Sequence, residues 1–146
     1  MNAPARSLSR AAAVIVLVHL LITVVHGWAH AQLHIDLSIA ANIFVLVVIG
    51  IGPLAGLVLL WSQRWRAGAA IVAFTMAASL LFGVWNHFVV ESADHVAHLP
   101  PGDARLPFQM TAWLLAVAEA AGALVGFAML RPGPVTTRQR VSPPSA

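Results

Sequence analysis

Residues 11–33 read AAAVIVLVHLLITVVHGWAHAQL, an apolar run that contains no Asp, Glu, Lys or Arg. About 20 such residues are enough for an α-helix to cross a bilayer. Three further apolar runs follow, the last of which contains a single Glu, so that the chain has four candidate spans: Ala11–Leu33, Leu37–Trp61, Ala67–Val90 and Phe108–Leu130. Because the connections at His34–Asp36 and Ser62–Arg66 are very short, successive helices are expected to run in opposite directions. The sequence therefore predicts an all-α integral membrane protein, built as an antiparallel bundle of four transmembrane helices.

The composition supports this class and excludes several kinds of chemistry. Hydrophobic residues make up 60% of the chain and charged residues only 9%, whereas about a quarter of the residues in a soluble domain are charged. The chain has no Cys, which excludes disulfides, thiolate metal sites and iron–sulfur clusters. Most of its glycines lie within apolar segments, where they serve helix packing rather than a phosphate-binding loop. The expected partners are the lipid bilayer and either further copies of the chain or a larger membrane complex, with no nucleic acid.

The arginines predict the orientation of the bundle. Arg supplies all eight basic residues, and all except Arg105 lie before the first run, after the second or after the fourth. Cytoplasmic loops carry an excess of Arg and Lys, so both termini are expected in the cytoplasm, with the bundle in a bacterial-type inner membrane. The expected organisation is a cytoplasmic tail over residues 1–10, a transmembrane domain over 11–131 and a disordered cytoplasmic tail, rich in Pro, Ser, Thr and Arg, over 132–146.

The N-terminal run also fits a cleavable signal peptide. Arg6 and Arg10 precede it, and Ala29–Ala31 gives a small-residue pattern near its end. His19 interrupts the apolar region, however, and the next run starts only a few residues later. These two features favour a retained transmembrane helix; cleavage would remove three histidines and leave three spans with the same downstream topology.

The seven histidines are the unusual feature of so apolar a chain, and all except His19 lie near the predicted outer face. At about 100° per residue, His19, His26 and His30 fall within a sector of the first helix about 40° wide. Thr23 and His34 lie just beside this sector. Lipid cannot satisfy a polar stripe, so this face is expected to point toward the other helices or a wet cavity.

A second polar stripe is expected on the third helix. At spacings of four, three and four residues, the chain places His87, Glu91, Asp94 and His98. Because residues 91–99 contain no Gly or Pro, the helix is expected to continue beyond the membrane surface, which would put all four on one face. The first and third helices both rise toward the outer face, so the two stripes should meet in the outer part of the bilayer.

Histidines four residues apart on a helix can direct both rings at one metal ion, and histidine with carboxylate suits Zn²⁺, Ni²⁺, Cu²⁺ or non-haem Fe. We therefore predict a periplasm-facing site for a divalent transition metal, with the ligands His26, His30, His87 and Glu91. Residues beyond this depth would form its entrance and raise the local cation concentration: His34, Asp94, His95 and His98. Such a protein would handle metal or serve as an accessory subunit, and no residue is assigned a catalytic role.

Two other functions fit the same residues. A four-helix membrane bundle with facing histidines is also the usual scaffold for haem b. His30 or His26 opposite His87 would then be the axial pair, with Gly83 leaving room for the porphyrin, in a cytochrome that takes electrons from quinol. Alternatively, the histidines are hydrogen-bonded packing residues of a non-catalytic assembly protein, or of a protein that responds to external pH.

His19 and Glu119 are considered separately, because each lies near the middle of its predicted span. An ionisable group is most costly at that depth, so the two are expected to approach one another. Glu119 shares a helix face with Gly122 and Gly126, which indicates that it points into the bundle. The pair is either a hydrogen-bonded clip between the first and fourth helices, which we favour, or part of a proton or ion path.

Overall fold

The computed structural model describes residues 3–131, and every regular element within this range is helical. In chain order, these elements are α1 (Ala3–Gln32), α2 (Ile39–Phe44), the π-helical η1 (Val45–Ile51), α3 (Gly52–Leu60), α4 (Trp65–Val84), the π-helical η2 (Trp85–Val89) and α5 (Arg105–Leu130). α2, η1 and α3 follow one another without a break, and η2 continues α4. The chain therefore has four helical spans, each long and apolar enough to cross a membrane.

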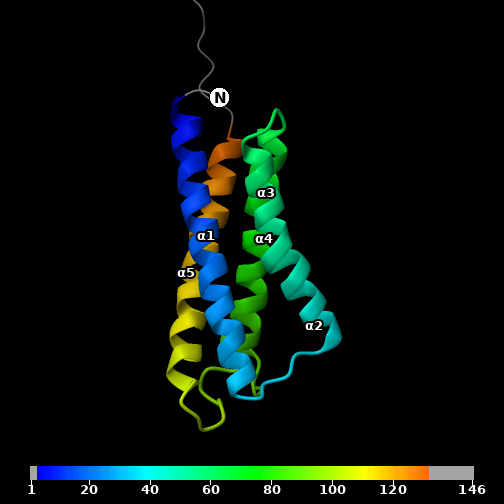
Figure 1. Ribbon diagram of the computed structural model, residues 1–146, viewed down its shortest axis with the longest axis vertical. Coiled ribbons are helices and arrows are strands. Elements are labelled where there is room, and N and C mark those ends of the chain that lie inside the picture. Colours follow the sequence, from blue (N-terminus) through cyan, green and yellow to red (C-terminus); the bar gives the residue numbers. More distant parts are fainter. Residues whose placement is uncertain (1–2, 132–146) are drawn as a thin grey trace, which may run out of the picture.

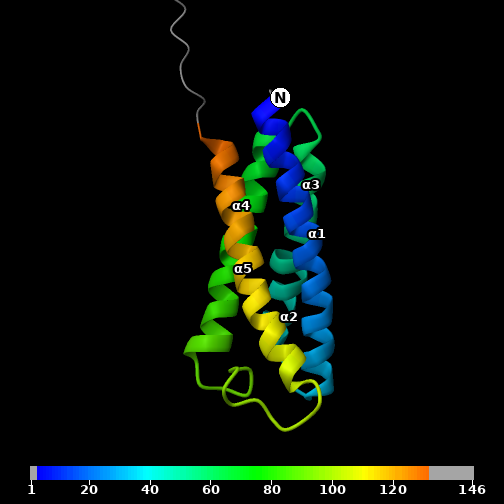
Figure 2. The same ribbon diagram turned by 90° about the vertical axis from the view of Figure 1, so that its left-hand side faces the viewer.

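The four spans lie side by side along the long axis of the molecule (Figures 1 and 2). α5 packs against both α1 and α4, and α4 packs in turn against α3. Residues 33–38 and 90–104, which connect spans, lie together at the end of the molecule opposite the start of α1 (Figure 1). We call this end the histidine end, because His30 and His87 lie close to it.

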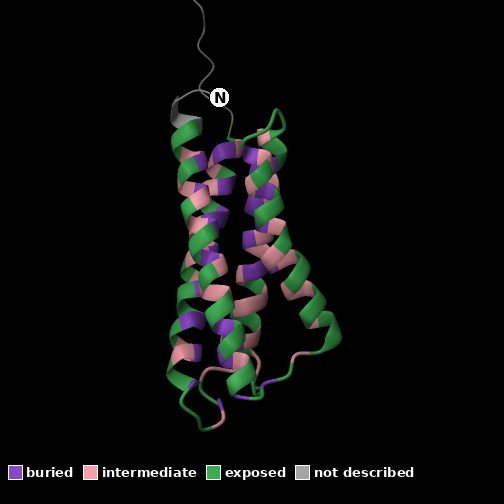
Figure 3. Ribbon diagram, viewed as in Figure 1, coloured by how far each residue is buried: buried purple, intermediate pink, exposed green. Residues whose placement is uncertain are grey.

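Two buried apolar clusters hold the spans together, and the burial pattern along the helices is visible in Figure 3. The larger cluster joins α1, α3, α4 and α5 and contains Ala12, Val16, Leu60, Ala69, Val72, Met76, Ala123 and Met129. The second cluster joins the connections at the histidine end to α1 and α5 and contains Ala29, Leu33, Ile35, Leu99, Ala104 and Phe108. The second cluster fixes where the connecting segments sit above the histidines.

Glycines allow α3, α4 and α5 to approach closely at the end opposite the histidine end. A Cβ atom added at Gly126 would lie 2.8 Å from the Cα of Ala73, and one added at Gly56 would lie 2.8 Å from Cγ2 of Val72. No real side chain tolerates such distances, so only glycine fits at these two positions. Small residues at helix crossings are the usual means of tight packing between membrane helices.

The second span leaves its neighbours toward the histidine end, where α2 departs from α1 (Figures 1 and 3). No residue of α2 is buried. The span changes from π-helical to α-helical geometry just before Pro53, which cannot supply an N–H to the helix ladder. π-Helical turns commonly accommodate such defects and redirect a helix. α1 therefore packs on α5, and more sparsely on α3, without a close partner in α2.

The third span ends earlier than expected. Val90 has an extended backbone (φ −84°, ψ 123°), and residues 91–104 form turns rather than a helix. The N–H of Val96 donates to the carbonyl of His87 at 3.0 Å, so this segment folds back over the end of η2. The expected continuation of the helix beyond the membrane surface is therefore wrong, because the folded-back segment gives the His87 carbonyl the hydrogen bond that the next helical turn would have made.

The first helix begins earlier than expected. α1 begins at Ala3, so helix occupies most of the range expected as an N-terminal tail, residues 1–10. The C-terminal tail expected over 132–146 lies outside the described residues.

Candidate metal centre

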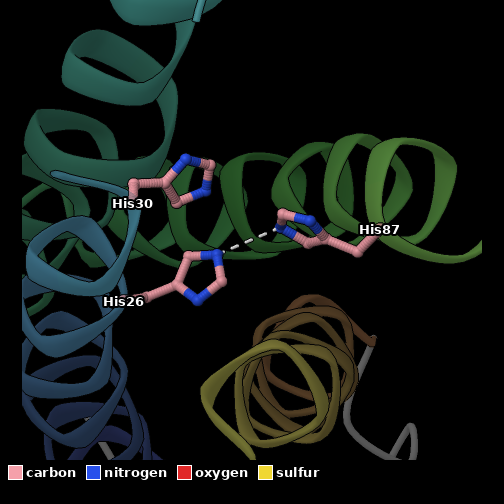
Figure 4. A group of neighbouring side chains, drawn as sticks. All are labelled: His26, His30 and His87. Carbon is pink, nitrogen blue, oxygen red and sulfur yellow. Dashed lines mark hydrogen bonds between the residues drawn. The ribbon is translucent and has the colours of Figure 1, made fainter. Parts of the chain in front are cut away.

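Three imidazole rings converge near the histidine end. His26 and His30 lie one turn apart on α1, and His87 lies on η2. Figure 4 shows the rings pointing toward one another from the two helices. One ring nitrogen from each lies within 4.8 Å of the others, and His26 and His87 are both buried. This group of three histidines could hold a metal ion.

The distance between His26 and His87 matches a pair of metal ligands. Their Nε2 atoms are 3.2 Å apart. Two nitrogens bound to a tetrahedral metal at about 2.0–2.1 Å lie about 3.3 Å from one another. The two rings are thus already separated as a tetrahedral ion requires.

The hydroxyl of Thr111 on α5 fixes the orientation of the His26 ring. Oγ1 of Thr111 lies 2.8 Å from Nδ1 of His26. The hydroxyl has one proton, and it donates that proton to the carbonyl of Pro107 at 2.7 Å, or to that of Phe108 at 3.0 Å. With its proton on a carbonyl, the hydroxyl accepts from His26, which assigns the proton of the neutral ring to Nδ1 and leaves a lone pair on Nε2.

Backbone carbonyls fix the other two rings in the same way. Nδ1 of His87 lies 3.1 Å from the carbonyl of Asp94, and Nδ1 of His30 lies 3.4 Å from the carbonyl of Ile35. A carbonyl only accepts, so both Nδ1 atoms carry a proton, and in the neutral rings both Nε2 atoms are left as acceptors. Outer hydrogen bonds that set the tautomer of a histidine in this manner are typical of metal ligands.

The tautomers create two contacts in which acceptor faces acceptor. One is the Nε2 to Nε2 contact of His26 and His87 at 3.2 Å. The other joins Nε2 of His30 to Oδ1 of Asp94, also at 3.2 Å. Oδ1 of Asp94 is buried and has no hydrogen-bond donor within the described part of the chain. Each contact is repulsive unless a cation, either a proton or a metal ion, lies between the two atoms.

Asp94 occupies the place that Glu91 was expected to take. The folded-back segment carries its carboxyl between His30 and His87, with Oδ1 3.4 Å from Nδ1 of His87. Burial by itself would raise the pKa of the Asp94 carboxyl, but the neighbouring His87 and His30 rings hold this pKa below its usual range. Glu91 is exposed and does not join the group of three histidines.

The expected entrance residues lie around the site rather than in it, except Asp94. His34 is exposed in the turn after α1, with a positive φ of 52°. His95 and His98 stack on one another with ring centroids 4.8 Å apart in the folded-back segment. His34 and His98 are exposed and remain accessible to cations from solution, whereas His95 is half-buried.

Phe108 and Thr111 belong to the site although neither was expected there. The ring of Phe108 is fully buried and lies with its centroid 4.5 Å from that of His26 and 4.8 Å from that of His30. The apolar Phe108 ring excludes water from the side of the His26 and His30 rings that it covers. Nothing in the sequence marked Thr111, because a Thr in an apolar helix usually bonds only to a carbonyl of its own helix.

His19 and Glu119, the pair expected near the middle of the bundle, lie further from the histidine end than the three histidines do. Nε2 of His19 is 3.3 Å from Oε1 of Glu119, and both side chains are buried. A cavity of about 330 Å³ connects this depth to the three histidines, since its lining includes Glu119 as well as all three. Nδ1 of His19 is buried and has no hydrogen-bond partner among residues 3–131.

The geometry disfavours a haem between α1 and α4. The rings of His26 and His87 are in direct contact, and Phe108 packs on the first of them. The flat macrocycle of a haem with two axial histidines lies between the two rings, and rings in direct contact leave no room for it. Because no family model, curated protein or solved structure matches this chain, the site itself has to carry the functional argument.

Proposed function

We propose that the chain is an integral protein of a bacterial-type inner membrane that binds a divalent transition metal at its periplasmic face. In this proposal the four spans form an antiparallel bundle, both termini lie in the cytoplasm and the histidine end faces the periplasm. The distribution of arginines supports this orientation, and the length and apolarity of the four spans support the membrane location.

One observation carries the metal assignment. The outer hydrogen bonds leave lone pairs on Nε2 of His26 and His87, and these lone pairs face one another at 3.2 Å. A packing role would favour tautomers in which one ring donates to the other, without any ion. The side chain and carbonyls that hold the rings instead prepare all three Nε2 atoms to receive a cation.

The proposed ligands are Nε2 of His26, His30 and His87, with Oδ1 of Asp94 as the fourth. Three imidazoles and one carboxylate suit Zn²⁺, Ni²⁺, Cu²⁺ or Fe²⁺, and not a soft Cu(I) ion. Asp94 replaces the Glu91 of the sequence-based ligand set, because only Asp94 reaches the rings.

Metal handling, such as capture for a membrane partner, fits this site better than catalysis. The exposed His34 and His98 and the half-buried His95 lie at the histidine end and would concentrate cations above it. With Asp94 bound, all four tetrahedral positions are filled, whereas a catalytic zinc keeps one open for water or substrate.

The test is a metal titration of protein that has been purified in mild detergent and stripped with chelator. We expect one Zn²⁺ per chain by calorimetry, and binding that weakens as the pH falls through the histidine range, because protons compete for the ligands. Cobalt in the same site should give the strong visible bands of a tetrahedral complex, and no Soret band should appear.

Alanine variants show whether the named histidines are the ligands. His30→Ala and His87→Ala should lose stoichiometric binding, whereas His98→Ala, an exposed histidine of the same end, should keep it and only slow loading. The proposal is wrong if the wild type and the His30/His87 double variant bind Zn²⁺, Ni²⁺, Cu²⁺ and Fe²⁺ equally weakly.

A further inference from the structure

The cavity beside the metal centre is larger than a metal ion needs. Its volume is about 330 Å³, whereas a single water occupies about 30 Å³ and pockets for small organic ligands measure about 300–1,000 Å³. The cavity reaches from the three histidines down to Glu119, and Val45, Ile49 and Leu115 give it apolar walls. It therefore has the size and the mixed lining of a site for an organic molecule.

The polar groups at the inner end of the cavity are hydrogen-bond acceptors. The Ser79 hydroxyl donates to the carbonyl of Thr75 at 2.8 Å, and the Thr23 hydroxyl donates to that of His19 at 2.9 Å. Oε1 of Glu119 faces His19, and the Glu119 carboxyl lines the cavity. A molecule bound here has to supply donors, because leaving buried acceptors unpaired is costly.

The cavity opens sideways between α1 and α2. Gly27 and Ala31 line it and are exposed, and a Cβ atom added at Gly27 would meet nothing within 4 Å. On the same stretch of α1, Val24 and Trp28 are exposed apolar side chains. With the spans placed across a bilayer, this opening faces lipid chains rather than water.

We propose that the cavity binds a neutral, lipid-soluble molecule of the quinol type, an aromatic head with hydroxyl groups and an apolar tail, which enters from the bilayer between α1 and α2. The head would donate to Glu119, Ser79 and Thr23, and the tail would leave past Gly27. The carboxylate of Glu119 repels an anionic head, and a cation at the histidines repels a cationic one. The ring of Phe82 lines the cavity and offers a flat surface for an aromatic head.

This inference goes beyond the proposed function, because it requires the membrane placement but not the metal. The structure holds a polar end and an apolar exit in one cavity, and that combination matches an amphipathic ligand delivered by the membrane. No electron transfer is part of the proposal, which concerns binding alone.

The first test compares a quinol with its own oxidised form. Protein in phosphatidylcholine nanodiscs is titrated under anaerobic conditions with radiolabelled decylubiquinol or decylubiquinone, and binding to empty nanodiscs is subtracted. We expect saturable binding of one quinol per chain, about tenfold tighter than that of the quinone, which has the same shape but no O–H donors. Absence of saturable quinol binding, or equal binding of the two forms, overturns the proposal.

The second test closes the opening. Gly27→Trp should abolish saturable binding, and Ala31→Phe should do the same at the next position that lines the cavity, so the result does not depend on one variant. Val24→Trp is the matched control, since it adds the same side chain to an exposed position of α1 that does not line the cavity. Equal binding by the Gly27→Trp, Ala31→Phe and Val24→Trp proteins overturns the proposed route.

A Zn²⁺ titration in the same nanodiscs separates this inference from the metal proposal. Quinol binding without Zn²⁺ binding would support the cavity site and overturn the metal site. Zn²⁺ binding without saturable quinol binding would support the metal site and overturn the cavity site.

Discussion

Thr111 lies 85 residues from His26 in the sequence, yet its hydroxyl oxygen is 2.8 Å from Nδ1 of that histidine. This one contact connects α5 to α1 and decides which ring nitrogen of His26 faces the metal centre. The Thr111 hydroxyl touches no ion itself, but by holding the His26 proton on Nδ1 it leaves the Nε2 lone pair free for a cation.

Replacing Thr111 by Val should weaken Zn²⁺ binding about 10–100-fold, the usual cost of losing a hydrogen bond behind a metal ligand. Valine keeps the shape but cannot accept from Nδ1, so the His26 proton is free to move to Nε2. Thr111→Ser keeps the hydroxyl and should retain nearly all of the affinity. Calorimetry measures both, and equal affinities of the Val and Ser variants would show that the contact does not set the tautomer.

The two neighbouring acidic residues of the folded-back segment should behave differently. Asp94→Asn should weaken Zn²⁺ binding strongly, because it removes the carboxylate that lies 3.2 Å from His30. Glu91→Gln should leave the dissociation constant within about twofold, since an exposed charge contributes little. The reverse ranking would restore the sequence-based ligand set and contradict the structure.

The Asp94 carboxyl also predicts a pH dependence in metal-free protein. Its pKa lies below the usual range, so its ionised form stabilises the fold above the unfolded-state pKa of about 3.9. The difference in unfolding free energy between wild type and Asp94→Asn should be constant from pH 7 down to about 5 and should shrink as the pH falls through the folded-state pKa. Chemical unfolding at a series of pH values measures it; a difference that grows toward low pH contradicts this assignment.

His19 and Glu119 should show energetic coupling. Their 3.3 Å contact is buried, so removing one partner leaves an unpaired polar group and should cost about 1–3 kcal/mol, more than removing both. The measurement is a thermal double-mutant cycle with His19→Leu and Glu119→Leu. Thr75→Val with Glu119→Leu is the control cycle, because the Thr75 hydroxyl bonds only within its own helix, and that cycle should be additive.

Gly126 should tolerate no side chain. Gly126→Ala places a Cβ atom 2.8 Å from the Cα of Ala73 and should destabilise the protein by about 1–3 kcal/mol through overpacking. Gly27→Ala meets nothing within 4 Å and should be neutral or slightly stabilising. Melting temperatures in one detergent compare the two variants directly, and similar values would contradict the close packing of α4 and α5.

The sequence was sufficient to predict the spans, because a continuous run of about 20 apolar residues matches the length of a helix that crosses the bilayer core. It also led to the three histidines, since the pair on α1 follows from the helical period alone. It failed beyond Val89 for a physical reason: a π-helical turn ends the regular spacing, and the chain then folds back. Asp94 and Thr111 reach the histidines through tertiary contacts that no period along one helix can reveal.

The facing lone pairs of His26 and His87 also determine the charge balance of the site. Before metal enters, the contact at 3.2 Å requires one proton, which the adjacent Asp94 carboxylate favours on the His87 ring. A divalent ion bound at the proposed site would displace this proton, so the buried charge would rise by one unit rather than two. Because burying charge in a medium of low dielectric constant is costly, this exchange would lower the cost of placing a doubly charged ion within a bilayer.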